Sequence, residues 1–257
     1  MIARTWSAYR YWMNLYRRTW RGTIVISVAN PLLFLLGIGA GLGNLVDAHA
    51  PTELGGVSYV AFFAPGLLAA ASMQTGFVEG AGRVAMAAGW NGAYRTATTT
   101  PLEPEEIMGG HLLFIAFRVL TSSASFVVVM AVFGVSRGWW AAATLPAALL
   151  TGLAFAAPAA AWAVTVRSSS QINTIFRFVI MPMYMFSGTF FAVAELPHWV
   201  RPVAYALPLW HGVELCRALS LGTETAAGAA VHVGYLLVLA VGGVLAARVT
   251  FRRRLHA

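Results

Sequence analysis

Lysine is absent from this sequence of 257 residues, and all 17 of its basic residues are arginine. A phosphate-binding P-loop needs a lysine side chain to reach the phosphates of a nucleotide. The missing lysine therefore excludes a P-loop ATPase within this chain. Any ATP hydrolysis that drives its function has to take place in another subunit.

Cysteine and aspartate are almost absent as well, with one residue of each, Cys216 and Asp47. A single cysteine excludes an internal disulfide and a paired-cysteine metal site, and Cys216 is expected to be a small packing residue. His211 and Glu214 stand three residues apart, but two ligands do not hold a zinc ion. We therefore expect no metal site.

Charge is also scarce, at 10% of the residues, against roughly 25% in ordinary soluble domains. Hydrophobic residues make up 59% of the chain, and its mean hydropathy is +0.71. These values predict an integral membrane protein. The formal net charge of +8 is explained by membrane topology, so nucleic acid is not an expected partner.

Residues 1–22 contain a helical stripe of large apolar side chains with arginines on one side of it. The stripe consists of Ile2, Trp6, Tyr9, Met13, Tyr16 and Trp20. This pattern predicts an amphipathic helix that lies in the membrane interface, with Trp and Tyr at headgroup depth. A cytosolic helix packed on the same protein is the alternative.

Six apolar segments follow, each long enough to cross the hydrocarbon layer as an α-helix. They cover residues 23–42, 57–78, 107–135, 139–166, 172–191 and 226–247. The third is expected to begin as a cytosolic helix at Pro104, because proline and acids suit a first turn. The sequence therefore predicts an all-α fold with a single transmembrane domain over residues 23–257.

The arginines orient these spans. With both termini in the cytosol, twelve lie inside: Arg4, Arg10, Arg17, Arg18, Arg21, Arg83, Arg95, Arg167, Arg248, Arg252, Arg253 and Arg254. Three lie outside, Arg137, Arg201 and Arg217, while Arg118 and Arg177 fall at the membrane boundary. The positive-inside rule therefore predicts a multi-pass plasma membrane protein with cytoplasmic termini.

Residues 83–108 form the only sizeable polar interruption in the first half of the chain. Irregular backbone is not tolerated against lipid, so this stretch is expected to lie in water or against another protein. Glu79 and Arg83, four residues apart at its start, are expected to form an ion pair. We expect this loop to be the docking surface for a separate motor subunit.

Residues 192–222 are too apolar for a hydrated linker and too rich in proline for a full span. Short re-entrant helices that enter the outer leaflet and return would satisfy both facts. Glu195, Glu214 and Arg217 would then be charges at membrane depth, where ionisable groups are often functional. Mutual neutralisation of Glu214 and Arg217 on one helix is the alternative.

Three pieces of the sequence resemble the membrane subunit of ABC-2 type ABC exporters, in particular the group of nodulation lipo-oligosaccharide and daunorubicin-type drug exporters. The first is FFAPGLL at 62–68, and the second is TPLEPEEI at 100–107 with the preceding Gly89, Tyr94 and Arg95. The third is FSGTFF at 186–191, LPHWV at 196–200 and LPLWHGVE at 207–214, followed by Arg217. The resemblance covers nearly the whole chain.

The resemblance implies a permease that works with two copies of a cytosolic ATPase, which bind ATP and Mg, and with a second permease subunit. It assigns coupling to Gly89, Trp90, Asn91, Tyr94, Arg95, Glu105 and Glu106. It places Asn30, Phe34, Met181 and Met185 on the translocation path, and Glu195, His211, Glu214 and Arg217 at the outer gate. Export of an amphipathic drug, lipid or glycolipid is the implied activity.

The sequence leaves two alternative functions open: a membrane-embedded enzyme that modifies lipids or glycans, and a passive channel. An enzyme of that kind wants a cluster of His, Asp or Glu at one membrane face, and the chain has one Asp. A channel needs no nucleotide. The sequence determines neither the cargo nor whether the permease pairs with an identical chain.

Overall fold

The computed structural model describes residues 2–38, 41, 57–90, 92–135, 140–166, 168–223 and 225–255. Within these ranges the regular elements are all helical, which confirms the all-α fold class. Asn91, Arg137 and Arg167, to which the sequence assigned roles or sides of the membrane, lie outside the described residues.

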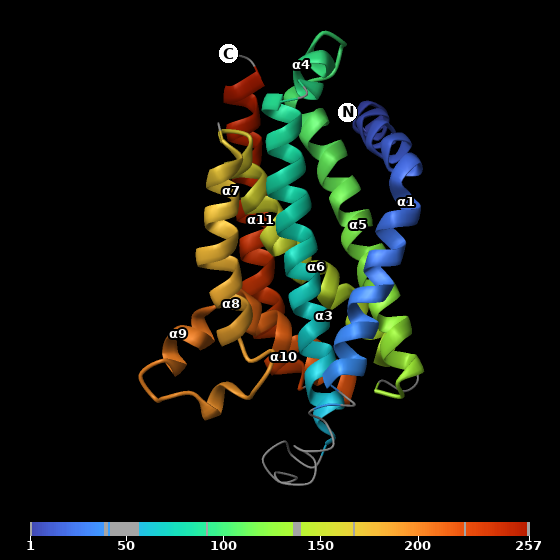
Figure 1. Cartoon of the computed structure of the whole chain (residues 1–257). Coiled ribbons are helices and arrows are strands. Elements are labelled where there is room, and N and C mark those ends of the chain that lie inside the picture. The colour runs from blue at the N-terminus through green and yellow to red at the C-terminus, as the bar shows by residue number, and fades with distance from the viewer. Residues whose placement is uncertain are drawn as a thin grey trace.

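The helices alternate in direction along one bundle (Figure 1). The α-helices are α1 Ile2–Ile38, α3 Tyr59–Phe77, α4 Ala93–Thr98, α5 Pro104–Val132, α6 Trp140–Ala163, α7 Ser169–Ile175, α8 Met181–Phe186, α9 Arg201–Ala206, α10 Pro208–Leu221 and α11 Ala226–Leu255. The π-helical turns are η2 Val78–Arg83, η3 Met86–Trp90 and η4 Phe176–Ile180, and η5 Val193–Glu195 is a 3₁₀ turn.

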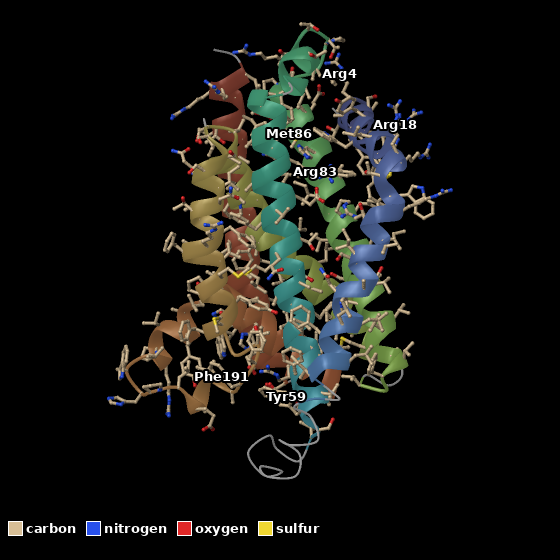
Figure 2. The ribbon with its side chains drawn as sticks, in the orientation of Figure 1. Arg4, Arg18, Tyr59, Arg83, Met86 and Phe191 are labelled. Carbon is tan, nitrogen blue, oxygen red and sulfur yellow. The ribbon has the colours of Figure 1, made fainter. Side chains whose placement is uncertain are left out.

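Both chain termini lie at the same end of the bundle as α4, whereas α9 and α10 lie at the opposite end (Figure 1). We refer to these as the α4 end and the α10 end. Arg4 and Arg18 lie towards the α4 end, and Tyr59 and Phe191 lie at the α10 end (Figure 2). This arrangement agrees with the predicted order of spans, in which the loop at 83–108 shares a side with both termini.

Five of the described helices are long and apolar enough to cross a membrane: Ile2–Ile38, Tyr59–Gly89, Pro104–Val132, Ala142–Ala163 and Ala227–Leu255. The predicted span at 172–191 is built from α7, η4 and α8, which follow one another over about 27 Å at 1.5 Å per residue. Its polar side chains, among them Asn173 and Arg177, lower its hydropathy. The count of six spans therefore stays a prediction.

The predicted end of that segment at Phe191 is wrong, because α8 ends at Phe186 and residues 187–191 form a bend. Gly188 has a φ of 78°, in the left-handed region that glycine adopts without strain. The helix therefore stops here, and the chain turns towards α9 and α10. Whether α9 and α10 enter the membrane stays a prediction.

The predicted boundary at residue 22 is not a break in the helix, because α1 continues from Ile2 to Ile38. Ile2, Trp6 and Trp20 are exposed, as the side chains of an interfacial face would be. Trp12 and Tyr16 are buried instead, and α1 packs along α5. The N-terminal segment therefore combines an exposed aromatic face with a face that packs on the same protein.

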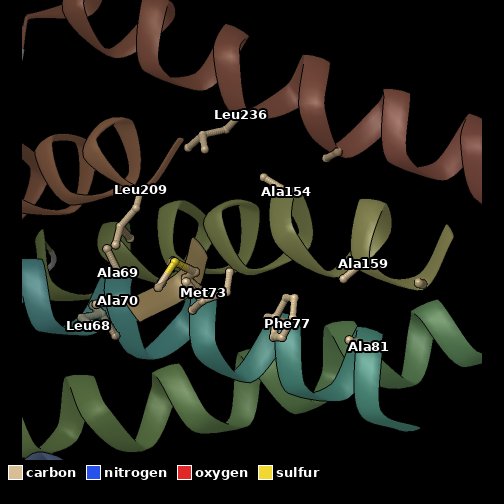
Figure 3. Close-up of a cluster of buried hydrophobic side chains, with 14 of the residues drawn as sticks. Leu68, Ala69, Ala70, Met73, Phe77, Ala81, Ala154, Ala159, Leu209 and Leu236 are labelled. Atoms are coloured by element: carbon tan, nitrogen blue, oxygen red, sulfur yellow. The ribbon is translucent and has the colours of Figure 1, made fainter. Parts of the chain in front are cut away.

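The centre of the bundle is the contact between α3 and α6, with α10 and α11 packed beside them (Figure 3). Gly76 on α3 faces Gly152 on α6, and a Cβ atom at Gly76 would lie 2.1 Å from the carbonyl oxygen of Gly152. One turn further, a Cβ atom at Gly80 would lie 2.6 Å from the Ala156 carbonyl oxygen. Small residues four apart permit this close approach of two helix backbones.

Candidate functional site

Most of the stretch at 83–108, predicted to be a loop, is folded into short helices. The π turns η2 and η3 extend α3, α4 follows, and α5 begins at Pro104 as predicted. Gly92 takes a φ of 61° directly before α4, which lets the chain turn between η3 and α4. The short helix α4 thus lies at the end of the bundle where both termini lie, and it connects α3 with its π turns to α5 (Figure 1).

Tyr94 attaches α4 to the bundle. Its side chain is 1% exposed, and its hydroxyl lies 2.5 Å from Nδ1 of His111 on α5. His111 stacks on Trp12 of α1 with ring centroids 3.9 Å apart, and the Phe251 ring of α11 lies 5.4 Å from the Tyr94 ring. Side chains from α1, α4, α5 and α11 therefore meet at Tyr94. We call Trp12, Tyr94, His111 and Phe251 the aromatic anchor.

Burial raises the pKa of the Tyr94 hydroxyl well above its ordinary value. The hydroxyl therefore stays protonated at physiological pH and keeps its hydrogen-bonding capacity towards His111. The anchor is a stable attachment rather than a titrating contact.

The predicted coupling residues divide into exposed and buried groups. Gly89 and Arg95 are exposed and Glu105 is half-buried, whereas Tyr94 and Glu106 are buried. Trp90 is the last residue of η3, and Asn91 lies outside the described residues. The buried members support the helices, so a partner that docks here would contact Arg95 and Glu105 instead.

Glu106 caps the N-terminus of α5. Its carboxylate accepts a hydrogen bond from the Glu103 backbone N–H at 3.1 Å, and the Glu103 side chain caps the helix in return. This reciprocal arrangement satisfies two backbone donors that a helix start leaves open. Glu106 therefore fixes where α5 begins, directly after α4.

A cavity of about 380 Å³ lies beside α4, between it and the first turns of α1. Tyr11 and Trp12 line it from α1, and Ala93 and Ala97 line it from α4. Its wall is mainly apolar, and it lies at the same end of the bundle as Arg95. The α4 end thus offers an exposed charge next to an apolar hollow.

Arg217 on α10 joins three segments at the α10 end. Its guanidinium donates to the Phe62 carbonyl oxygen at 3.2 Å, to the Gly188 carbonyl oxygen at 2.6 Å and to the Glu214 carboxylate at 2.6 Å. It also lies over the Phe62 ring, 3.8 Å from the centroid. The pairing of Glu214 with Arg217, one of the two alternatives from the sequence, is present in the structure. The additional contacts tie α10 to α3 and to the bend at 187–191.

His211 contacts a second histidine that the sequence reasoning missed. Its Nδ1 lies 2.8 Å from Nδ1 of His232 on α11, and its ring stacks on Tyr235 with centroids 4.0 Å apart. Glu195, assigned with them to the outer gate, is exposed on the separate turn η5. The structure therefore brings His211, Glu214 and Arg217 together on α10, while Glu195 belongs to another element.

The predicted path residues lie on two helices that flank α3 in the view of Figure 1. Asn30 and Phe34 are on α1, and Met181 and Met185 are on α8. Phe34 is 45% exposed and Met185 56% exposed, which leaves both available to a substrate or a second subunit. Their role in translocation stays a prediction.

Arg118 forms a buried polar cluster with Glu79 and Tyr16. From the sequence, Arg118 is expected only to lie at the membrane boundary. Its Nε lies 3.2 Å from the Glu79 carboxylate, and its Nη1 donates to the Tyr16 hydroxyl at 3.2 Å. Glu79 also pairs with Arg83, which confirms the predicted contact between residues four apart. The sequence signal for this cluster is an arginine within an apolar helix, because a charge at such a position needs an ion-pair partner.

The sequence of this chain is similar to that of known transporter proteins. Residues 5–221 match the ABC-2 type transporter family. The chain is 31% identical over 257 residues to nodulation protein J of Rhizobium leguminosarum bv. viciae, covering 95% of each chain. It is 32% identical over 256 residues to nodulation protein J of Rhizobium leguminosarum bv. trifolii, covering 95% of this chain and 94% of the relative.

The family match extends over most of the chain, from α1 to the end of α10. It includes both the α4 end with its aromatic anchor and the α10 end with its arginine contacts. The bundle of membrane-length helices is what a transporter membrane component requires. The chain belongs to the ABC-2 type transporter family, as a multi-pass membrane component.

Proposed function

We propose that this chain is the permease subunit of an ATP-driven exporter in the bacterial plasma membrane. It pairs with a second permease subunit and with two copies of a cytosolic ATPase, which bind ATP and Mg. The α4 end and both termini lie in the cytosol. The cargo is an amphipathic molecule, such as a drug, lipid or glycolipid.

The aromatic anchor is the observation that carries this proposal. A partner that displaces α4 acts on Tyr94, which is buried against side chains of α1, α5 and α11. Side chains in direct contact transmit displacement to one another. Motion imposed at α4 would therefore reach three membrane-length helices at once, which is what coupling to an external motor requires.

The contacts of Arg217 support a closed outer end in the same scheme. The guanidinium connects α10 to the start of α3 and to the bend after α8. Release of a cargo at this end requires these elements to separate or to move together. The contacts of Arg217, including its ion pair with Glu214, would therefore oppose opening of the outer end.

Co-purification tests the motor assignment. The full chain is co-expressed with a candidate ABC ATPase from the same genome, and ATPase retention and ATP-dependent uptake into inverted vesicles are measured. Arg95→Glu and Glu105→Arg reverse charge at the α4 end and should abolish retention. Glu195→Arg reverses an exposed charge at the opposite end and should keep it.

Thiol labelling tests the orientation independently. The lone native cysteine, Cys216, is fully buried, so an introduced Arg95→Cys reports with little background. A membrane-impermeant reagent should label this position in inverted vesicles and leave it unlabelled in intact cells. Labelling in intact cells would place α4 out of reach of a cytosolic ATPase and would end the proposal.

A further inference from the structure

A cavity of about 310 Å³ lies between α1, α3 and α5, with polar side chains among its apolar lining. Arg118 and Glu79 line it, together with Thr23, Ser27, Asn30, Gln74, Thr75 and Ser122. The cavity exists because α1 packs along α5 and makes little contact with α3. It is therefore a lateral cleft with α5 as its floor.

The number of polar side chains in this cleft is unusual for its position. All three of its helices are long and apolar enough to span a membrane. Polar groups that face hydrocarbon without partners cost free energy, so such a cleft has to hold water or a polar group of another molecule. Asn30 is exposed on α1, which shows that the cleft opens to the outside of the chain.

The charge of the cleft favours an anion. Arg118 and Glu79 are the charged lining residues, and Arg83, which pairs with Glu79 outside the lining, adds a second positive charge nearby. A guanidinium has five N–H donors, and the contacts of Arg118 with Glu79 and Tyr16 use two of them. Donors thus remain for an acceptor in the cleft, and arginine binds phosphate oxygens well because its planar fork matches their geometry.

The depth of the cleft suits a headgroup rather than a solute from bulk water. Arg118 contacts Tyr16, which belongs to the segment expected to lie in the interface at the α4 end. The other lining residues of α1, from Thr23 to Pro31, lie deeper along the helix. Ile26, Val78 and Phe126 line the cleft with apolar side chains, against which an acyl chain can pack.

We propose that this cleft binds a membrane phospholipid with an anionic headgroup, with its phosphate at Arg118 and an acyl chain along Ile26, Val78 and Phe126. The headgroup enters from the leaflet at the α4 end. The binding depends only on the residues of this chain. It needs neither the ATPase nor transport, so its test stands apart from that of the proposed function.

Native mass spectrometry of the purified full chain provides the test. The protein is exchanged into nanodiscs that contain phosphatidylglycerol and phosphatidylcholine in equal amounts, and the retained lipids are counted. The wild-type chain should retain roughly tenfold more phosphatidylglycerol. Both lipids carry the phosphate, but the choline cation of phosphatidylcholine is repelled by the arginines, and a repulsion of about 1.4 kcal/mol is one decade in affinity. Arg118→Gln should bring the ratio close to one.

A cleft-filling variant guards against misfolding of Arg118→Gln, which removes a partner of Glu79. Ser27→Phe fills the cleft without touching that ion pair and should remove the preference. Val25→Phe is the matched control, because Val25 is 64% exposed on the same helix and lies outside the cleft. It should retain the wild-type ratio.

Soluble sn-glycerol 3-phosphate distinguishes a lipid from a free phosphate. It should not displace the bound phosphatidylglycerol, because it lacks the chain that packs in the cleft. Displacement by this soluble ligand would overturn the lipid assignment. Equal retention of the two lipids by the wild-type chain, or an unchanged ratio in Ser27→Phe, would overturn the site.

Discussion

The hydroxyl of Tyr94 lies 2.5 Å from Nδ1 of His111, and this contact attaches the short helix α4 to α5. Both side chains are at most 1% exposed, so the contact is shielded from bulk solvent. The pair therefore fixes α4 mechanically, and its partners in the aromatic anchor extend that attachment to α1 and α11.

Tyr94→Phe removes the hydroxyl and keeps the ring. We expect a loss of about 1 kcal/mol in stability, which lowers the thermal unfolding midpoint in detergent by about 2–4 °C, because the buried His111 loses its partner. Tyr11→Phe is the control, since Tyr11 is 54% exposed on α1. Equal midpoints for the two variants would show that the Tyr94–His111 contact contributes nothing to stability.

Glu105 and Glu106 should respond differently to the same change. Glu106→Ala removes the reciprocal cap of α5 and should cost about 1 kcal/mol, measured by denaturation of the purified chain. Glu105→Ala should stay within about 0.5 kcal/mol of wild type, because that side chain is only half-buried and outside the cap. A greater loss for Glu105 than for Glu106 would refute this division between a docking and a structural residue.

The sequence predicted those features that depend on neighbouring residues. The start of α5 at Pro104 and the Glu79–Arg83 pair follow from local chemistry, and the structure contains both. The Glu214–Arg217 pair, which the sequence offered as one of two alternatives, is also present. Hydropathy likewise identified the membrane-length helices. Periodicity of 3.6 residues and first-turn preferences act within a single helix, so one sequence contains this information.

Contacts between distant residues could not be predicted in that way. Tyr94 lies in a polar stretch of the sequence, which predicts a side chain that faces water. In the structure it is buried and contacts His111, which lies on another helix. The His211–His232 contact joins two different helices for the same reason. The Gly76–Gly80 spacing was an available signal of close helix packing, and it indicates the face of α3 that α6 covers.

Arg217 should tolerate no substitution that removes its planar guanidinium group, whose N–H donors reach several acceptors at once. Arg217→Lys keeps the charge but cannot reach the Phe62 and Gly188 carbonyl oxygens together, and we expect a loss of about 2 kcal/mol. Arg217→Gln also leaves Glu214 without its cation and should cost about 3 kcal/mol. Unfolding in detergent measures both, with the exposed Arg252→Lys as the control. A Lys variant as stable as wild type would contradict the fork geometry.

Gly76→Ala tests the contact at the centre of the bundle. The added methyl would lie 2.1 Å from the Gly152 carbonyl oxygen, so α3 and α6 must separate, and overpacking of this kind costs about 1–3 kcal/mol. Gly82→Ala is a matched control on the same helical segment, because a Cβ atom there meets nothing within 4 Å. It should not destabilise the chain, since alanine favours helix over glycine. If Gly76→Ala were as stable as Gly82→Ala, the two backbones could not be in the close contact that positions α10 and α11 around them.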